Sequence, residues 1–379
     1  WHKRDPLYTQ ISWDSLYQAN YRTNLANPTG NAKYALERRH NDLMETALNS
    51  VYTNQFNRYL KITAGVDAKY SKGIHYKTMD DLLGANQWID IDQFADRDLT
   101  GTLLGKDAKI VQNDLRNPNR VIKQGDVFGY NYNLDIYTAN VFAQNEWKLS
   151  QLELYYAAKL TYTQFSRFGK MENGRAAVDN VQSYGRGQKW SKFTPSFKLG
   201  ASYIIDNRNK LSVNSLYELR SPIPNNAYVS PRIKDTFVKG LAPEKVYTVD
   251  IAYNFNYKSV KGRISAFNTT IKDGVELSSY YDDSYRTFVN HSLTNINKSY
   301  KGIEAGIAVK LNSSFTLSLA GTIAEYVYTD SVKGILSPEN GAFKDIEDDV
   351  MLKGLKLSTG PQTAGSIALD YFHPTMWFV

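Results

Sequence analysis

Residues 60–70 read LKITAGVDAKY and alternate strictly between apolar or aromatic side chains and polar or small ones. A strand puts successive side chains on opposite faces, whereas a helix would scatter these apolar residues around its axis. The same alternation recurs at residues 152–163 (LELYYAAKLTYT), 193–205, 247–257 and 303–311. These stretches predict an all-β protein in which one face of each strand is apolar.

Short and long connections alternate along the chain. Tight turns are expected near residues 57–58, 148–151, 206–209, 259–262, 312–314 and 372–374. Long polar loops are expected at residues 78–129, 170–189, 222–244, 274–297 and 330–360. A barrel threaded through a membrane has short turns on one rim and long loops on the other. We therefore predict a transmembrane antiparallel up-and-down β-barrel, present in part as about twelve strands, with all long loops on one rim.

The composition agrees with a barrel. No apolar run approaches the ~18 residues of a membrane helix, and the mean hydropathy is −0.47, as expected when every second strand residue faces a polar lumen. The chain has 28 Tyr and 6 Trp, residues that favour a membrane interface. Its net charge of +7 is spread along the chain, so we expect no nucleic-acid partner. With no Cys, disulfides and thiolate metal sites are excluded.

One face of the strands is expected to contact lipid. The residues predicted to do so are Leu60, Ile62, Val66, Leu152, Leu154, Phe197, Leu199, Val249, Ile251, Ile307 and Val309. The alternative is a large soluble β-sandwich or solenoid, in which these side chains would pack between sheets. Between residues 132 and 147 the alternation changes phase near residues 137–139, which we interpret as a β-bulge.

Three motifs in order resemble a known family. Residues 241–255 read LAPEKVYTVDIAYNF, residues 264–275 read ISAFNTTIKDGV, and the tripeptide FVN at 288–290 is followed by KGIEAGI at 301–307. They are similar to the "leucine, proline, glutamate" strand, the "I-x-D" step and the "Y-x-N … K-G-x-E" hairpin of TonB-dependent outer-membrane receptors. The resemblance covers mainly residues 130–379.

That family implies energised import of a scarce nutrient across the outer membrane of a Gram-negative bacterium. Its barrel has about twenty-two strands and an N-terminal plug. Residues 1–379 contain no segment resembling the plug, so we expect a single partial barrel region. Its terminal strands, near residues 47–56 and 377–379, would have unpaired edges. The implied partners are lipid, the TonB complex through a plug absent from this sequence, and a small ligand such as an iron chelate, cobalamin, a glycan or a peptide.

Aromatic and polar residues of the long loops are the candidates for ligand binding, because function concentrates on loops carried by a rigid scaffold. The other interpretation of the rings is an outer aromatic girdle or ordinary loop packing. The candidates are Trp88, Tyr184, Trp190, Asn225, Asn226, Tyr228, Arg232, Tyr280, Tyr281 and Tyr285.

Other motifs point to no further chemistry. Residues 101–107 resemble a phosphate loop, but the motif is one residue short and has Asp107 where Ser or Thr binds magnesium. Acidic clusters at Asp90/Asp92/Asp96/Asp98, Asp282/Asp283 and Glu347/Asp348/Asp349 could hold a hard cation such as calcium, but they lack calcium-loop spacing, so we favour solvated loop charge. We expect no cofactor, no metal site and no catalytic residue. A passive porin is the alternative function, and an outer-membrane enzyme is a third.

Overall fold

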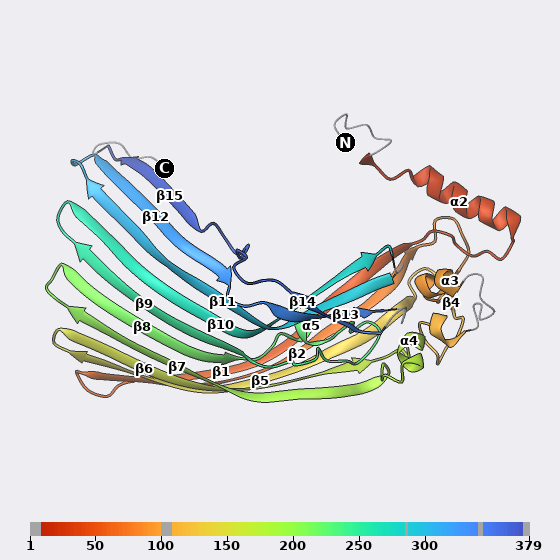
Figure 1. Ribbon diagram of the computed structural model, residues 1–379, viewed down its shortest axis with the longest axis horizontal. Coiled ribbons are helices and arrows are strands. Elements are labelled where there is room, and N and C mark those ends of the chain that lie inside the picture. Colours follow the sequence, from red (N-terminus) through yellow and green to blue (C-terminus); the bar gives the residue numbers. More distant parts are fainter. Residues whose placement is uncertain (1–8, 100–107, 285–286, 340–343, 374–379) are drawn as a thin grey trace.

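The computed structural model describes residues 9–99, 108–284, 287–339 and 344–373. Its main feature is one thirteen-stranded antiparallel sheet with a concave side (Figure 1). Apart from β13 and β14, the strands of this sheet pair in chain order. They are β1 (Leu36–Gln55), β2 (Leu60–Asp81), β5 (Val127–Leu149), β6 (Leu152–Gly169), β7 (Gly185–Ile204), β8 (Asn209–Arg220), β9 (Glu244–Asn256), β10 (Val260–Asp282), β11 (Thr287–Lys310), β12 (Phe315–Tyr328) and β15 (Thr363–Tyr371). This is the up-and-down arrangement that the alternation predicts.

The register brings the apolar positions of successive strands together on one side, which we call the outer face. One row of direct cross-strand partners runs through Leu60, Trp147, Leu154, Ala201, Val213, Ile251, Ala266, Ile303 and Ile323. Because side chains alternate along a strand, a one-residue slip in any pair would interrupt this apolar row.

The neighbouring row, one residue further along each strand, belongs to the opposite side, which we call the inner face. It contains Lys61, Glu146, Tyr155, Asn214 and Asp250. The Tyr155 hydroxyl donates to Asn214 Oδ1 over 3.0 Å, and Asn214 Nδ2 donates to Asp250 Oδ2 over 2.9 Å. Hydrogen bonds of this kind satisfy the polar side chains of the inner face.

The residues expected to contact lipid all lie on the outer face, and none of them is buried. Phe197 is 53% exposed, Leu199 61% and Ile251 48%. No second sheet covers them in the described part of the chain. The prediction that they are not packed between two sheets is therefore confirmed.

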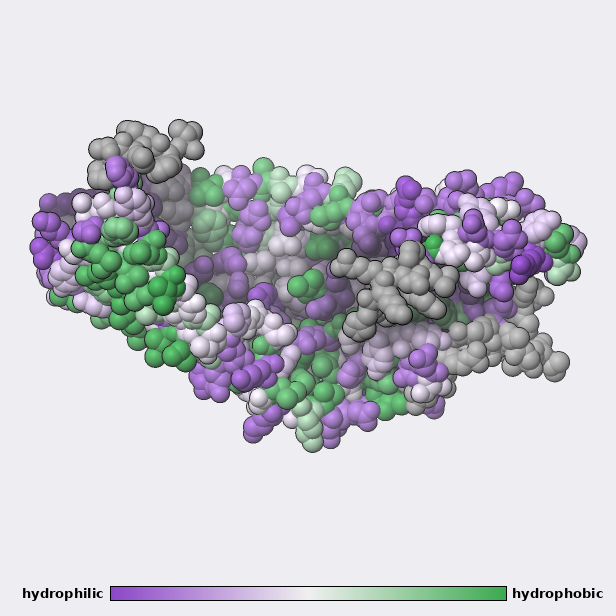
Figure 2. All heavy atoms as spheres, turned by 90° about the horizontal axis from the view of Figure 1, so that it is seen from above, coloured by the Kyte–Doolittle hydropathy of each residue, from purple (hydrophilic) through white to green (hydrophobic). Residues whose placement is uncertain are grey.

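The two ends of the sheet differ as predicted. The tight turns lie at one end, on the left in Figure 1, and the long connections lie at the other. Hydrophilic residues gather at the end of the long connections, whereas hydrophobic residues are prominent on the strands at the opposite end (Figure 2). Pro374, the last residue of the sixth expected turn, lies outside the described residues.

The long connections contain short elements. Between β2 and β5 lie β3 (Trp88–Ile89), α3 (Gln93–Leu99), the 3-10 helix η1 (Lys109–Val111) and β4 (Val121–Ile122). The other connections contain α4 (Gly174–Val178), α5 (Pro224–Ala227), β13 (Val332–Pro338) and β14 (Ile346–Val350). The helix α2 (Trp13–Ala26) precedes β1. None of the described helices has the length and apolar character needed to cross a membrane.

Two expectations about local structure were wrong. Residues 274–297 are mostly strand, because β10 and β11 stay paired up to Asp282 and Thr287, and β13 pairs with the extended part of β11. The phase change near residues 137–139 is not a bulge, since pairing with both neighbours is continuous there. Its cause is that the apolar side chains of Leu134 and Ile136 belong to the inner face, where a loop packs on them.

The sheet is not closed within the described residues, because β1 and β15 each pair on one side only. The strand expected at 47–56 begins earlier, at Leu36, and forms one edge. The other edge is β15, and the strand expected at residues 377–379 lies outside the described residues. Unpaired strand edges carry free N–H and C=O groups, which lipid does not satisfy.

Candidate ligand-binding site

The connection between β8 and β9, residues 222–244, folds onto the inner face and forms a small core there. Phe165 of β6 and Trp190 of β7 are direct partners, and their rings stack with centroids 5.0 Å apart. Tyr228 and Phe237 of the connection pack edge-on against Phe165 at 6.1 and 6.0 Å. Phe165 and Tyr228 are fully buried. This aromatic core fixes the position of the connection relative to the sheet.

Two buried charged groups also hold the connection. Arg167 donates through Nε to the carbonyl of Pro231 over 2.6 Å and through Nη1 to that of Ser183 over 2.6 Å. Asp235 accepts from the backbone N–H of Gln188. Gly187 allows this close approach, because a Cβ there would lie 2.2 Å from Asp235 Cγ. Burial raises the pKa of the Asp235 carboxyl, opposed by the Gln188 hydrogen bond and by Arg167.

A cavity of about 830 Å³ adjoins this core, and Tyr132 belongs to both. It is bounded by the ends of β1, β2 and β5, by residues 88–94 and 173–175, by the connection 222–244, and by the extended hairpin of β10 and β11. The cavity therefore lies at the end of the long connections. Its volume is in the range of typical small-molecule sites.

Aromatic rings form much of the wall of the cavity. Phe94 and Phe288 meet edge to face at 5.4 Å, and Tyr281 contacts both rings. Tyr130 and Tyr132 lie 6.1 Å apart on β5, and Tyr132 stacks on His75 at 4.8 Å. Trp88, Phe128 and the other lining rings bring apolar area with few rotatable bonds.

Most charges of the wall are neutralised by the protein itself. Glu37 pairs with Arg39 at 2.6 Å and with Lys77 at 2.8 Å. Asp92 and Arg175 form a buried ion pair. Asp92 also accepts from the N–H groups of Phe94 and Ala95 at the start of α3. These ion pairs and hydrogen bonds connect the segments that form the cavity wall and order the loops around it.

Two further lining residues are charged. Glu339 accepts from Ser230 Oγ at 2.6 Å and from Asn290 Nδ2 at 3.3 Å. The Arg232 guanidinium lies over the ring of Tyr130, 5.2 Å from its centroid.

The structure brings some of the predicted binding residues together and not others. Trp88, Asn225 and Arg232 line the cavity, and Tyr281 contacts two lining rings. Trp190 and Tyr228 belong to the aromatic core instead. Tyr184 lies under Arg116, Asn226 donates to the Val275 carbonyl, and Tyr280 is exposed. Tyr285 lies outside the described residues.

Sequence reasoning missed several lining residues, chiefly Tyr130, Tyr132, Phe288 and Arg175. For Tyr132 a signal was present in the change of phase of β5, which marks the place where inner-face residues become apolar. Arg175 had no such signal, because its role depends on a partner 83 positions earlier, Asp92.

The acidic clusters have protein partners. Asp90 is buried and accepts from Asn113 Nδ2 at 2.8 Å, from the Gly129 N–H at 2.9 Å and from Arg120 at 3.1 Å. Glu347 pairs with Lys333 and Lys239. No group of three or more potential metal ligands occurs among the described residues. Residues 101–107, which resemble a phosphate loop, lie outside them.

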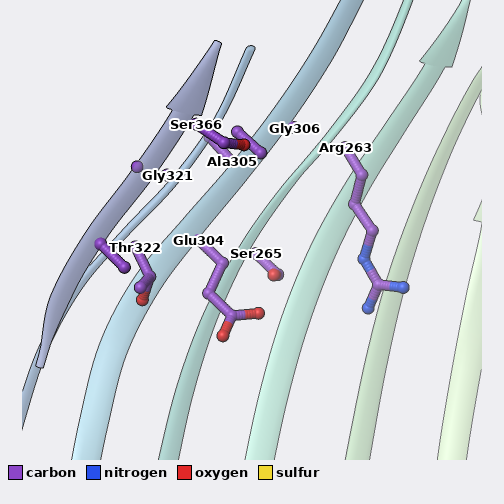
Figure 3. A pocket seen from close by; sticks show the side chains of 11 residues that line it. Arg263, Ser265, Glu304, Ala305, Gly306, Gly321, Thr322 and Ser366 are labelled. Carbon is purple, nitrogen blue, oxygen red and sulfur yellow. The ribbon is translucent and has the colours of Figure 1, made fainter. Parts of the chain in front are cut away.

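A second hollow, of about 620 Å³, lies on the inner face of β10, β11, β12 and β15 (Figure 3). Small residues such as Gly306, Gly321 and Ser366 form most of it, with Glu304 between Ser265 and Thr322 and Arg263 at one side. Glu304 is the direct partner of both Ser265 and Thr322. With a single wall of strands and without aromatic lining, this hollow is a weaker candidate for ligand capture than the cavity.

Comparison with known proteins identifies the scaffold. Residues 3–378 match the family described as "TonB dependent receptor-like, beta-barrel". A search of curated proteins gives no match. Among solved structures, the copper transporter OprC is 11% identical with a TM-score of 0.55, over 79% of this chain and 42% of OprC.

Two further structures are similar. The siderophore receptor PiuA from Acinetobacter baumannii is 12% identical with a TM-score of 0.53, over 88% of this chain and 44% of PiuA. The ferric yersiniabactin uptake receptor FyuA from Yersinia pestis is 10% identical with a TM-score of 0.47, over 88% of this chain and 40% of FyuA. At such identities the likeness shows the fold alone. The chain spans less than half the length of each of these proteins.

Proposed function

Since this chain belongs to the TonB dependent receptor-like β-barrel family, we propose that it captures a scarce small nutrient and imports it across the outer membrane with energy delivered through TonB. Members of this family are outer-membrane proteins of Gram-negative bacteria, and the similar structures are transporters and receptors rather than enzymes. The proposal places the outer face of the sheet in lipid and assigns no catalytic residue.

The observation that carries the proposal is the position and chemistry of the cavity. It lies at the end of the long connections, opposite the tight turns. In a membrane barrel of this kind, long loops emerge on the extracellular rim. Aromatic rings with a few fixed polar groups are typical of a site that binds one small ligand and orients it.

The nutrient is a separate question, because a fold does not fix its cargo. The titles of two structures with the same fold name a copper transporter and a siderophore receptor. A metal ion or iron chelate is thus one candidate, beside cobalamin, glycans and peptides. In this proposal TonB acts through a plug held against the inner face.

Growth on a single limiting nutrient tests the proposal. A strain lacking the protein should fail on the nutrient that it imports, and loss of TonB should cause the same failure. Uptake of the labelled nutrient should stop when an uncoupler collapses the proton gradient. Uptake that persists without TonB and without the gradient would instead support the passive porin.

A pair of variants connects uptake to the cavity. Asn225→Trp narrows the cavity, because Asn225 lines it, and should reduce uptake. Tyr184→Trp places the same indole side chain at an exposed position outside the lining and should leave uptake unchanged. Equal uptake by both variants would show that the ligand enters elsewhere.

A further inference from the structure

Arg232 differs from the other charged residues of the cavity. Four cationic side chains and three carboxylates line it. Arg39 and Lys77 share Glu37, and Arg175 pairs with Asp92. Among the described residues, no carboxylate forms an ion pair with Arg232.

The nearest acidic neighbour along the wall does not neutralise this charge. Glu339 lies close to the connection, because Ser230 Oγ donates to it, but its Oε1 accepts from the neutral donors Ser230 and Asn290. An arginine is charged at every physiological pH. Within the described part of the chain, the cavity therefore keeps one cation without a counter-charge.

The structure also holds Arg232 in place. The preceding residue, Pro231, is fixed by the hydrogen bond from buried Arg167 to its carbonyl. Ser230, in the left-handed region at φ 60°, accepts through its carbonyl from the N–H groups of Ile233 and Lys234, which closes a turn around Arg232. A backbone ordered in this way lowers the entropy that binding must overcome.

An aromatic ring lies beside this cation. Arg232 sits over Tyr130, which is partly exposed, whereas the neighbouring Tyr132 is buried between His75 and Arg167 and supports Tyr130 from below. A guanidinium over a ring still presents N–H groups that form paired hydrogen bonds with a carboxylate or a similar anion. The exposed part of the Tyr130 ring can then contact a planar part of the same ligand.

We propose that the cavity selects ligands that join an anionic group to a flat aromatic body, with Arg232 binding the anion and Tyr130 contacting the ring. The proposal rests on the proposed function only for the transport of such a ligand. Its recognition chemistry is independent of transport.

Three probes of one shape and different charge test this on the intact protein in detergent. They are 2-naphthoate, 2-naphthalenemethanol and 2-naphthylmethylamine, which are anionic, neutral and cationic near pH 7.5. Calorimetry should show 2-naphthoate binding most tightly, by about tenfold over the neutral probe, as expected for hydrogen bonds to a charged group. Equal affinity for the three probes, preference for the amine, or no binding would overturn the proposal.

Variants assign the effect to Arg232. Arg232→Gln should remove the preference for 2-naphthoate and leave the affinity for the neutral probe within about twofold, whereas Arg232→Lys should keep part of the preference. Arg208→Gln is the matched control, because Arg208 also lies over a tyrosine ring, Tyr257 at 5.5 Å, but at a tight turn. If Arg232→Gln does not fold, the charge series on the unaltered protein decides alone.

Transport is measured separately, so that the two proposals fail differently. Naphthoate binding that depends on Arg232, in a protein whose loss affects no TonB-dependent uptake, would support this inference and contradict the proposed function. TonB-dependent uptake of a nutrient by a protein that binds the three probes equally would support the function and overturn the inference.

Discussion

The two ends of the sheet show what an alternating sequence does and does not encode. Near the tight turns the outer face is largely apolar and the inner face largely polar, and β2, β8 and β9 show this contrast with period two. Near the long connections the inner face of β5 to β7 is covered by residues 222–244, so Leu134, Phe165 and Trp190 on that face are apolar or aromatic. Their neighbours on the outer face, Asp135, Ser166 and Lys189, are polar. Periodicity therefore reveals a strand that separates two environments, and its phase reverses where the apolar environment moves to the other face.

The largest effect is expected at the aromatic core. Phe165→Ala removes a ring with no exposed surface, and large-to-small changes of this kind cost about 3–5 kcal/mol. Because the ring holds residues 222–244, hydrogen exchange should show that this connection loses protection. Phe197→Ala is the control, on an outer-face ring that is 53% exposed. If both variants lost the same stability and protection, the distinction between core and outer face would fail.

Introducing a charge at two adjacent positions tests the assignment of the outer and inner faces of the sheet. Ile323 lies in the outer-face row, and the preceding residue, Thr322, faces inward opposite Glu304. Ile323→Arg should cost about 2–4 kcal/mol of stability in a bilayer, as for arginine placed near the midplane of a barrel. Thr322→Arg should cost much less, since Glu304 and the polar inner face accommodate the charge. Urea unfolding in liposomes measures both, and equal costs would contradict the assignment of the outer face to lipid.

The contrast between the two faces of the sheet explains which parts of the fold could be predicted from the sequence. Residues 60–70 and 247–256 lie in the predicted strands and share the predicted face, because the two faces of the sheet impose opposite demands on neighbouring residues. The sequence did not predict that β10 and β11 extend beyond residue 274. There β11 pairs with β13, and this pairing extends the sheet into residues expected to form a loop. A strand pairing between distant segments leaves no local periodic signal.

The candidate site was less predictable than the fold. Trp88, Asn225 and Arg232 were identified as loop residues and do line the cavity. Tyr228 was identified by the same criterion and is buried in the core. Arg232 and Tyr228 lie four residues apart in the same connection, so only the path of the connection decides which of them faces the cavity.

The helix α2 differs from both ends of the sheet. It is attached to the sheet neither through the apolar outer-face row nor through the aromatic core. Asn20, its one buried residue, is 1% exposed. Its amide donates to the carbonyls of Tyr34, Leu82 and Leu83, and its Oδ1 accepts from the N–H groups of Lys33 and Tyr34.

Replacing this side chain should release the helix without affecting the sheet. Asn20→Ala leaves buried backbone groups unsatisfied, at a cost of about 1–3 kcal/mol. Proteolysis within residues 13–35 should accelerate, while the stability of the sheet stays the same. Gln18→Ala, at an exposed position of the same helix, should change neither. Loss of sheet stability in Asn20→Ala would mean that α2 is part of the scaffold.

The smallest expected effect is a pH dependence of the connection that carries Arg232. Burial raises the pKa of the Asp235 carboxyl, more than the Gln188 N–H and Arg167 lower it. A carboxyl whose pKa is higher in the folded state stabilises that state fully below its unfolded value of about 3.8, and this contribution is lost as the pH rises through the raised value. Protection of residues 222–244 against hydrogen exchange, corrected for the intrinsic rate, should therefore decline as the pH rises from about 4 to neutral.

Two variants assign this pH dependence to one carboxyl. Asp235→Asn keeps an oxygen for the Gln188 N–H and removes the charge, so the protection of residues 222–244 in this variant should not depend on pH in this range. Asp206→Asn, at a tight turn, changes a carboxyl whose pKa is lowered chiefly by its hydrogen bonds to Asn209, and it should leave the dependence intact. A decline that persisted in Asp235→Asn would assign it to another group and leave Asp235 as an uncharged anchor of the connection.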